Sequence, residues 1–245
     1  MLMPVPSRTQ PTHPGPGSGE GWTVLLPLKG GQRAKSRLGA SPELASAIAL
    51  DTLRATLCCP VVREVRVITS DPALARSCTD LGAYVCPESV RGAGLRPAVR
   101  DGIRALVGSR TAGAVVPVAV LLGDLPAMRP QDLRCALDAM AGALTSGAGG
   151  TAAMGIVPDL EGTGTVLLAA SAPRHLVPAF GPGSAAAHVR AGALRLALDL
   201  PRLRLDVDTR ADLRRAVGWG VGPLTAERLR IESGTGPSDG ACPGS

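Results

Sequence analysis

Both lysines of this 245-residue chain lie in one loop, which follows an apolar run. Lys29 comes directly after residues 23–28, and Lys35 and Arg37 follow later in the loop. Backbone N–H groups between a strand and a helix N-terminus can cradle a phosphate, whose charge the cations neutralise. The loop therefore indicates a phosphate site. A solvated basic loop is the alternative, because neither the Walker A pattern nor the dinucleotide-binding glycine pattern is present.

Three aspartates each follow an apolar segment. Asp124 comes after residues 115–122, and Asp206 and Asp208 follow the short segment 203–205. Side chains alternate along a strand, so Asp206 and Asp208 should share one face. Oxygen ligands of this type suit Mg²⁺, which keeps several waters and bridges carboxylates to substrate phosphates. We therefore expect a magnesium site at these three aspartates.

Simpler interpretations of the same aspartates stay open. Asp124 stands two residues before a proline and can be a turn residue. Asp208 or Thr209 can cap a helix that begins at Arg210, with Asp212 completing a capping box.

Two further loops, 158–165 and 180–188, place glycines beside hydroxyl groups. Glycine lets the backbone approach a ligand closely. In the second loop, Ser184 stands at the start of a predicted helix, whose free N–H groups and dipole favour an anion. The alternative for either loop is a hairpin or a capped turn. We interpret His188 as a packing or surface histidine and assign it no chemistry.

Strand and helix signals alternate between these motifs. Apolar positions at helical spacing predict a helix from Ser41 to Leu57. The alternation indicates an α/β fold with a doubly wound, mostly parallel sheet, whose ligands bind beyond the carboxyl ends of the strands. The basic loop and the aspartates fall at that edge. The predicted strands are 23–28, 65–69, 83–86, 115–122, 151–157, 164–170 and 203–205, and the further helices are 72–81, 97–107 and 183–193.

Composition limits the classes of partner. Aromatic residues make up 2% of the chain, which argues against aromatic platforms for nucleic-acid bases. The net charge of +6 permits nucleic-acid binding, but the arginines are scattered, and a small anionic substrate explains the charge equally well. The cysteines form no C-x-x-C pair, so we expect reduced thiols.

The two ends of the chain are rich in proline, glycine and serine. We expect disordered tails at residues 1–20 and 233–245 around a single domain at 21–232. The first tail has no apolar core of a signal peptide, and no apolar run reaches the roughly 18 residues of a membrane span. We expect a cytoplasmic protein that binds neither membrane nor nucleic acid. A homodimer is left open.

Taken in order, the motifs resemble the guanylyltransferases of coenzyme F420 biosynthesis, which act on 2-phospho-L-lactate or phosphoenolpyruvate. The resemblance covers residues 24 to 222. Two positions depart from the usual family pattern, because Arg96 stands where asparagine follows Gly-Leu and Val166 stands where asparagine follows Gly-Thr-Gly-Thr. The motifs are Pro27-Leu28-Lys29, 34–38, Asp124-Leu125-Pro126, 158–159 with 162–165, 180–184 with His188, and 206–209.

The resemblance implies a fold similar to the nucleotide-sugar pyrophosphorylases. It also implies that GMP passes from GTP to a phosphorylated three-carbon acid with release of pyrophosphate. By the same resemblance, Asp124, Asp206 and Asp208 hold Mg²⁺. Acceptor binding falls to Lys29, Thr165, Gly181 and Ser184, and GTP binding to Lys35, Arg37 and Gly94.

Two other functions remain open from the sequence. One is a different nucleotidyltransferase of the same fold, acting on a sugar phosphate or the molybdenum cofactor, although those enzymes usually open with a Gly-x-Gly loop. The other is a non-catalytic, arginine-rich protein that binds nucleic acid. A nicotinamide dehydrogenase is disfavoured, because residues 29–33 lack the dinucleotide glycine spacing.

Overall fold

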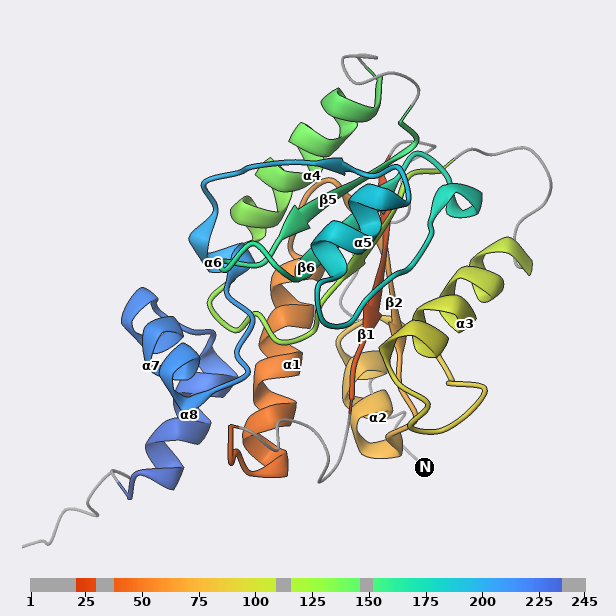
Figure 1. Cartoon of the computed structure of the whole chain (residues 1–245). Coiled ribbons are helices and arrows are strands. Elements are labelled where there is room, and N and C mark those ends of the chain that lie inside the picture. Colours follow the sequence, from red (N-terminus) through yellow and green to blue (C-terminus); the bar gives the residue numbers. More distant parts are fainter. Residues whose placement is uncertain (1–20, 30–37, 109–115, 146–151, 235–245) are drawn as a thin grey trace, which may run out of the picture.

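A computed structural model describes residues 21–29, 38–108, 116–145 and 152–234 (Figure 1). The predicted tail 1–20 and all of the predicted tail 233–245 beyond residue 234 lie outside these ranges, as do Lys35 and Arg37. Among the described helices, none is long and apolar enough to cross a membrane.

The described strands form one sheet of seven strands in the order β3-β2-β1-β4-β6-β5-β7. All pairings are parallel except those of β6, which runs antiparallel to both β4 and β5. The mostly parallel α/β sheet predicted from the sequence is therefore confirmed. The strands are β1 (Trp22–Pro27), β2 (Val62–Ile68), β3 (Tyr84–Cys86), β4 (Val118–Leu121), β5 (Met154–Pro158), β6 (Thr165–Ala170) and β7 (Leu194–Arg195).

Helices cover both faces of the sheet (Figure 1). Their caps follow from the local sequence: the Ser41 hydroxyl accepts from the backbone N–H of Leu44, and Asp71 caps the next helix in the same way. The helices are α1 (Pro42–Leu57), α2 (Pro72–Asp80), α3 (Leu95–Gly108), α4 (Pro130–Thr145), α5 (Ser184–Arg190), α6 (Pro201–Arg204), α7 (Arg210–Trp219) and α8 (Pro223–Glu232), with a 3₁₀ turn at Pro173–His175.

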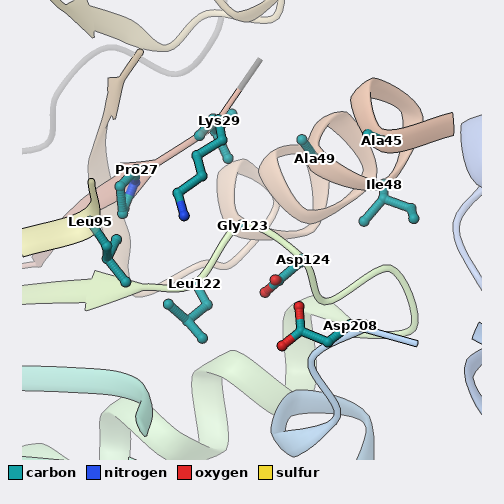
Figure 2. Close-up of a pocket in the computed structure, with 11 residues that line it drawn as sticks. Pro27, Lys29, Ala45, Ile48, Ala49, Leu95, Leu122, Gly123, Asp124 and Asp208 are labelled. Atoms are coloured by element: carbon teal, nitrogen blue, oxygen red, sulfur yellow. The ribbon is translucent and has the colours of Figure 1, made fainter. Parts of the chain in front are cut away.

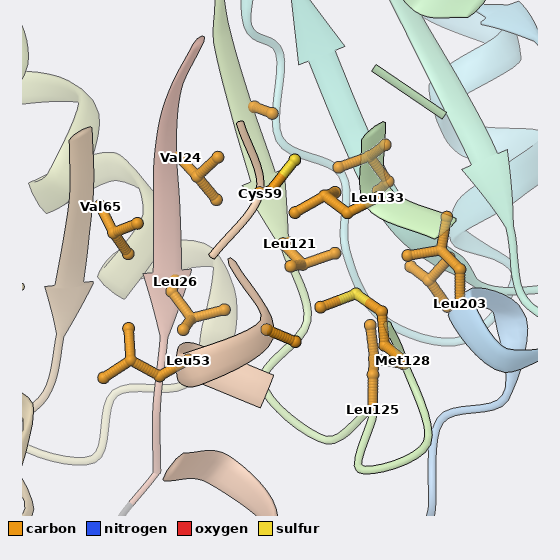
Figure 3. Close-up of a cluster of buried hydrophobic side chains, with 14 of the residues drawn as sticks. Val24, Leu26, Leu53, Cys59, Val65, Leu121, Leu125, Met128, Leu133 and Leu203 are labelled. Atoms are coloured by element: carbon orange, nitrogen blue, oxygen red, sulfur yellow. The ribbon is translucent and has the colours of Figure 1, made fainter. Parts of the chain in front are cut away.

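The alternation of side chains along the central strands divides the core into two layers. Val24 and Leu26 of β1 pack with residues of α1, α2 and α4 on one face, as Figure 3 shows in part. Leu25 points to the other face, where α3 and α5 contribute the apolar contacts. Because helices cover both faces of the sheet, β1 and β4 are buried along their whole length.

One predicted strand is wrong, and several helices were not identified from the sequence. Residues 203–205, expected as a last strand, belong mostly to α6, in which Arg204 donates its backbone N–H to the Leu200 carbonyl at 3.1 Å. Pro201 supplies the first helical position, which it suits because it has no N–H to satisfy there. The helices α4 and α8 and the short strand β7 are not among the elements predicted from the sequence.

Candidate active site

Lys29 and Asp124 lie beyond the carboxyl ends of two neighbouring strands. β1 and β4 pair in parallel, so both ends open onto the same edge of the sheet. A cavity of about 160 Å³ lies between them and α1, and both side chains line it together with Asp208. Figure 2 shows the carboxylates of Asp124 and Asp208 directed toward one another, with the Lys29 side chain extending toward the same cavity.

Gly123 brings the two strand ends into close contact. A Cβ atom at this position would stand 2.2 Å from Cδ2 of Leu28 and 3.2 Å from the Pro27 carbonyl oxygen. The segment that carries Lys29 therefore packs directly on the backbone that carries Asp124. The residue after Asp124 is held by α1, because the Thr52 hydroxyl accepts the backbone N–H of Leu125 at 3.0 Å.

The segment 205–208 reaches the same edge without being part of the sheet. Val207 donates its backbone N–H to the Asp124 carbonyl at 3.0 Å, and its side chain is fully buried in a small apolar cluster under α1 and α7. Asp206 and Asp208 stand on either side of Val207 in the sequence. The charge of Asp206 interacts with the charges of Asp208 and Asp124. A helix cap was one alternative for this motif, and the structure shows that Thr209 and Asp212 form the capping box of α7.

Asp206 is in an electrostatic environment that disfavours its charged form. Burial, followed by the charges of Asp124 and Asp208, raises the pKa of Asp206 to about 7. Asp159 adds a further negative charge. The site thus concentrates oxygen donors whose repulsion a bound cation would relieve.

A structural frame around Arg204 explains why Asp159 is near. The Arg204 guanidinium donates to the carbonyls of Pro158, Asp159 and Leu198, and its own carbonyl accepts from the Leu160 N–H at 2.7 Å. These contacts hold the turn between β5 and β6 against the start of the 205–208 segment. The Asp159 carboxylate itself accepts the backbone N–H groups of Thr163 and Gly164, at 2.8 and 2.7 Å.

The two glycine-containing loops, 158–165 and 180–188, lie against each other. The loop 158–165 is the turn of an antiparallel hairpin, as one of the two alternatives predicted. Its Thr163 carbonyl accepts the backbone N–H of Ala185, in the first turn of α5. Gly181 and Gly183, with φ values of 126° and 68°, form the turn into that helix, a region that favours glycine.

His188 contacts both loops through its two ring nitrogens. It is fully buried, its Nε2 accepts the Ala179 N–H at 2.9 Å, and its Nδ1 lies 3.0 Å from the Thr165 hydroxyl. Because Nε2 accepts, the neutral ring carries its proton on Nδ1. Burial is the main cause that lowers the pKa of His188 to about 4, so the ring is uncharged at neutral pH. The packing interpretation of His188 is thus confirmed.

Comparison with known proteins identifies the family. The chain is 48% identical over 211 residues to the phosphoenolpyruvate guanylyltransferase of Salinispora arenicola, with 84% of this chain and 92% of that protein covered. It is 45% identical over 215 residues to the enzyme of the same name from Streptomyces scabiei, covering 84% and 94%. The chain belongs to the phosphoenolpyruvate guanylyltransferase family. It is thus a nucleotidyltransferase by family, as the sequence motifs indicated. No family model matches the chain.

Solved structures with low sequence identity to this guanylyltransferase-family chain agree on the fold. Rv0371c from Mycobacterium tuberculosis H37Rv superposes with a TM-score of 0.51 at 19% identity, covering 82% of this chain and all of that one. A 4-diphosphocytidyl-2C-methyl-D-erythritol synthase gives 0.51 at 17% identity, again with 82% and 100% coverage. At these identities the likeness concerns the fold alone.

The structure thus brings some of the predicted site residues together. Lys29, Asp124 and Asp208 share the cavity, with Asp206 beside them. The other predicted acceptor residues lie in the two loops, where Thr165 and Ser184 are buried at 2% and 3% exposure and Gly181 is exposed. Gly94 precedes α3 with φ of 105°, whereas Lys35 and Arg37 lie outside the described residues.

Two residues beside the site, and a third that joins α1 to α8, had no assigned role in the sequence. Arg204 and Asp159 contact backbone groups far apart along the chain, and only the tertiary structure shows those contacts. Asp51 of α1 is similar: its carboxylate is 4% exposed and accepts the N–H groups of Leu224 and Thr225 at the start of α8. An aspartate amid the apolar stripe of α1 was the available signal.

Proposed function

We propose that this protein transfers GMP from GTP to phosphoenolpyruvate, or to 2-phospho-L-lactate, and releases pyrophosphate in the biosynthesis of coenzyme F420. One observation supports this reading most strongly. In a chain of the phosphoenolpyruvate guanylyltransferase family, Lys29 and three aspartates gather at the edge of the sheet where ligands of such folds bind.

The aspartates fit a divalent cation. All donors are oxygens, as Mg²⁺ prefers. Burial and then the charges of Asp124 and Asp208 raise the pKa of Asp206, and a bound cation would offset both effects. Among the described residues, no three His, Cys, Asp or Glu side chains lie together closely enough to hold a metal ion by themselves. Mg²⁺ at these aspartates would have to take part of its coordination from waters and substrate phosphates. When bound at Asp124, Asp206 and Asp208, Mg²⁺ would supply charge neutralisation for the phosphates.

The chain's own groups bind and orient the two substrates. An oxygen of the acceptor phosphate attacks the α-phosphorus of GTP, and the bond to the bridging oxygen breaks as pyrophosphate leaves. No general base is required, because the attacking phosphate is already ionised near neutral pH. Lys29 supplies a fixed cation for the charge that develops at the phosphorus. Alignment of the attacking and leaving oxygens provides the rest of the acceleration.

The predicted site residues fall into two sets, one for each substrate. We assign the acceptor's phosphate and carboxylate to Lys29, Thr165, Gly181 and Ser184. We assign the triphosphate and base of GTP to Lys35, Arg37 and Gly94. Residues 21–232 would form one such domain. A cytoplasmic location and a homodimer remain predictions.

Pyrophosphate release is the assay that tests this function. GTP, Mg²⁺ and a phosphorylated three-carbon acid should all be needed, and omission of any one should stop release. Comparing phosphoenolpyruvate with 2-phospho-L-lactate identifies the acceptor, and replacing GTP by ATP or CTP tests the base. Release with sugar phosphates but with neither acid would show that the protein is another nucleotidyltransferase of this fold.

A further inference from the structure

Arg96 connects the start of α3 to the turn that leads into α5. Its Nε donates to the carbonyl of Phe180, and its Nη2 lies 3.5 Å from the place where a side chain on Gly181 would begin. Its neighbour in sequence, Leu95, lines the cavity that also contains Lys29 and Asp124. Arg96 therefore contacts the Phe180–Gly181 turn, and the residue before it lines the cavity.

The positive charge of Arg96 has no anionic partner among the described residues. The side chain is exposed, and its hydrogen bond to Phe180 uses Nε alone. Arg104 of the same helix, by contrast, pairs with Asp101 at 3.3 Å. His188 packs behind the turn and is neutral, mainly because it is buried and in smaller part because of the charge of Arg96. Arg96 thus places a positive charge at this turn.

The two ends of the acceptor differ in what they need. Its phosphate must face Lys29 and the aspartates, because that phosphate reacts with GTP. We place its carboxylate at the Gly181–Ser184 turn, whose residues are assigned to the acceptor above and which has none of the three aspartates. The two Nη groups of an arginine present a planar pair of donors that matches the two oxygens of a carboxylate.

We propose that Arg96 binds the carboxylate of the acceptor acid and thereby selects phosphorylated acids over other phosphate esters. This inference rests on the proposed guanylyltransferase function. Arg96 holds the acceptor at the end remote from the reacting phosphorus, so its contribution belongs to acceptor binding. The bond to Phe180 fixes the guanidinium in place before the acceptor arrives.

The experiment compares Arg96→Gln with Arg104→Ala. Glutamine keeps a donor for the Phe180 carbonyl and loses the charge, whereas Arg104→Ala removes one arginine charge from the same helix, away from the turn. In Arg96→Gln we expect the KM for the acceptor to rise roughly 10- to 100-fold, the range of a charge-assisted hydrogen bond. The KM for GTP and the melting temperature should stay near their parental values, and Arg96→Lys should recover part of the loss.

A pair of inhibitors isolates the carboxylate. Isopropyl phosphate has the shape of 2-phospho-L-lactate with a methyl group in place of the carboxylate. The parent protein should bind phospholactate more tightly, and Arg96→Gln should remove most of that preference while leaving the affinity for isopropyl phosphate unchanged. Calorimetric titration with each ligand in the presence of Mg²⁺ measures the two affinities without turnover.

The outcomes separate the inference from the function on which it rests. If the parent protein transfers GMP but Arg96→Gln keeps its acceptor KM and its preference for phospholactate, the inference is overturned and the function stands. Equal rises in both KM values with a lower melting temperature would show that Arg96 only fastens α3 to the turn, which also overturns it. If the parent neither transfers GMP nor distinguishes the two ligands, both fail.

Discussion

Val207 donates its backbone N–H to the carbonyl of Asp124 at 3.0 Å, across 83 positions of sequence. This bond places two aspartates beside a third, although the segment that carries them lies outside the sheet. The buried Val207 side chain fixes which way its neighbours face, because side chains alternate along an extended segment. The hydrogen bond and the apolar side chain of Val207 therefore both help to assemble the acidic part of the site.

The raised pKa of Asp206 predicts how stability depends on pH. The pKa is about 7 in the folded protein against an ordinary value of 3.8, so the folded state holds this proton more tightly. The stabilising contribution is complete below about pH 4 and is lost as the pH rises toward about 7. Without divalent cations, the free energy of unfolding should therefore fall over this interval.

The variant Asp206→Asn tests whether Asp206 causes this pH dependence of stability. The variant removes one charge from the cluster and should melt above the parent at pH 8, by about 2–4 °C for each kcal/mol of repulsion relieved. The difference should shrink toward pH 5, where the parent is protonated. MgCl₂ should raise the melting temperature of the parent more than that of the variant. A variant less stable than the parent at pH 8 would show that Asp206 is held by favourable contacts.

Asp208→Asn and Asp212→Asn separate metal binding from helix capping. Asp212 completes the capping box of α7 through the backbone N–H and hydroxyl of Thr209. Its replacement should cost about 0.5–2 kcal/mol of stability and leave turnover intact. Asp208 takes no part in that cap, so Asp208→Asn should abolish pyrophosphate release and leave the melting temperature near that of the parent. The reverse pattern would favour the capping interpretation of the motif.

Gly123→Ala tests the close contact between the two strand ends. The added methyl group would overlap the buried Leu28 side chain and approach the Pro27 carbonyl oxygen to 3.2 Å, so the segment before Lys29 must repack. We expect a loss of about 1–3 kcal/mol in stability, as for overpacking, together with a clear loss of turnover. Gly218→Ala in α7 is the matched control, because a Cβ there meets nothing within 4 Å. Thermal melts and pyrophosphate release of both variants provide the comparison, and equal behaviour would exclude a role for the contact.

The sequence predicted the parts of the site that follow directly from buried strands. Lys29 and Asp124 come after apolar runs that match β1 and β4, and parallel strands place their ends together. The strand at 203–205 failed because three residues of alternating polarity fit a short helix equally well. The position of Asp206 could not follow from a strand that does not exist, and it depends on Val207 and Arg204 instead.

The two glycine-containing loops were likewise predicted only in part. The sequence identified the glycines of both loops from their composition alone. It did not show that His188 connects Thr165 with Ala179, or that Arg96 reaches Phe180, because those contacts join positions far apart in the chain. Local patterns predict where a turn lies, and the packing of the helices decides what the turn meets.

The rate of pyrophosphate release by Lys29→Ala, at saturating GTP and phosphoenolpyruvate, tests the central claim most directly. Lys29 follows β1 at the rim of the cavity that holds Asp124 and Asp208. A fixed cation opposite developing charge stabilises the transition state by about 2.7–4 kcal/mol, so kcat should fall roughly 10²- to 10³-fold. Lys29→Arg should not restore it, because a planar guanidinium cannot take the place of a compact ammonium. A parental kcat in Lys29→Ala would mean that this loop is only a solvated basic surface.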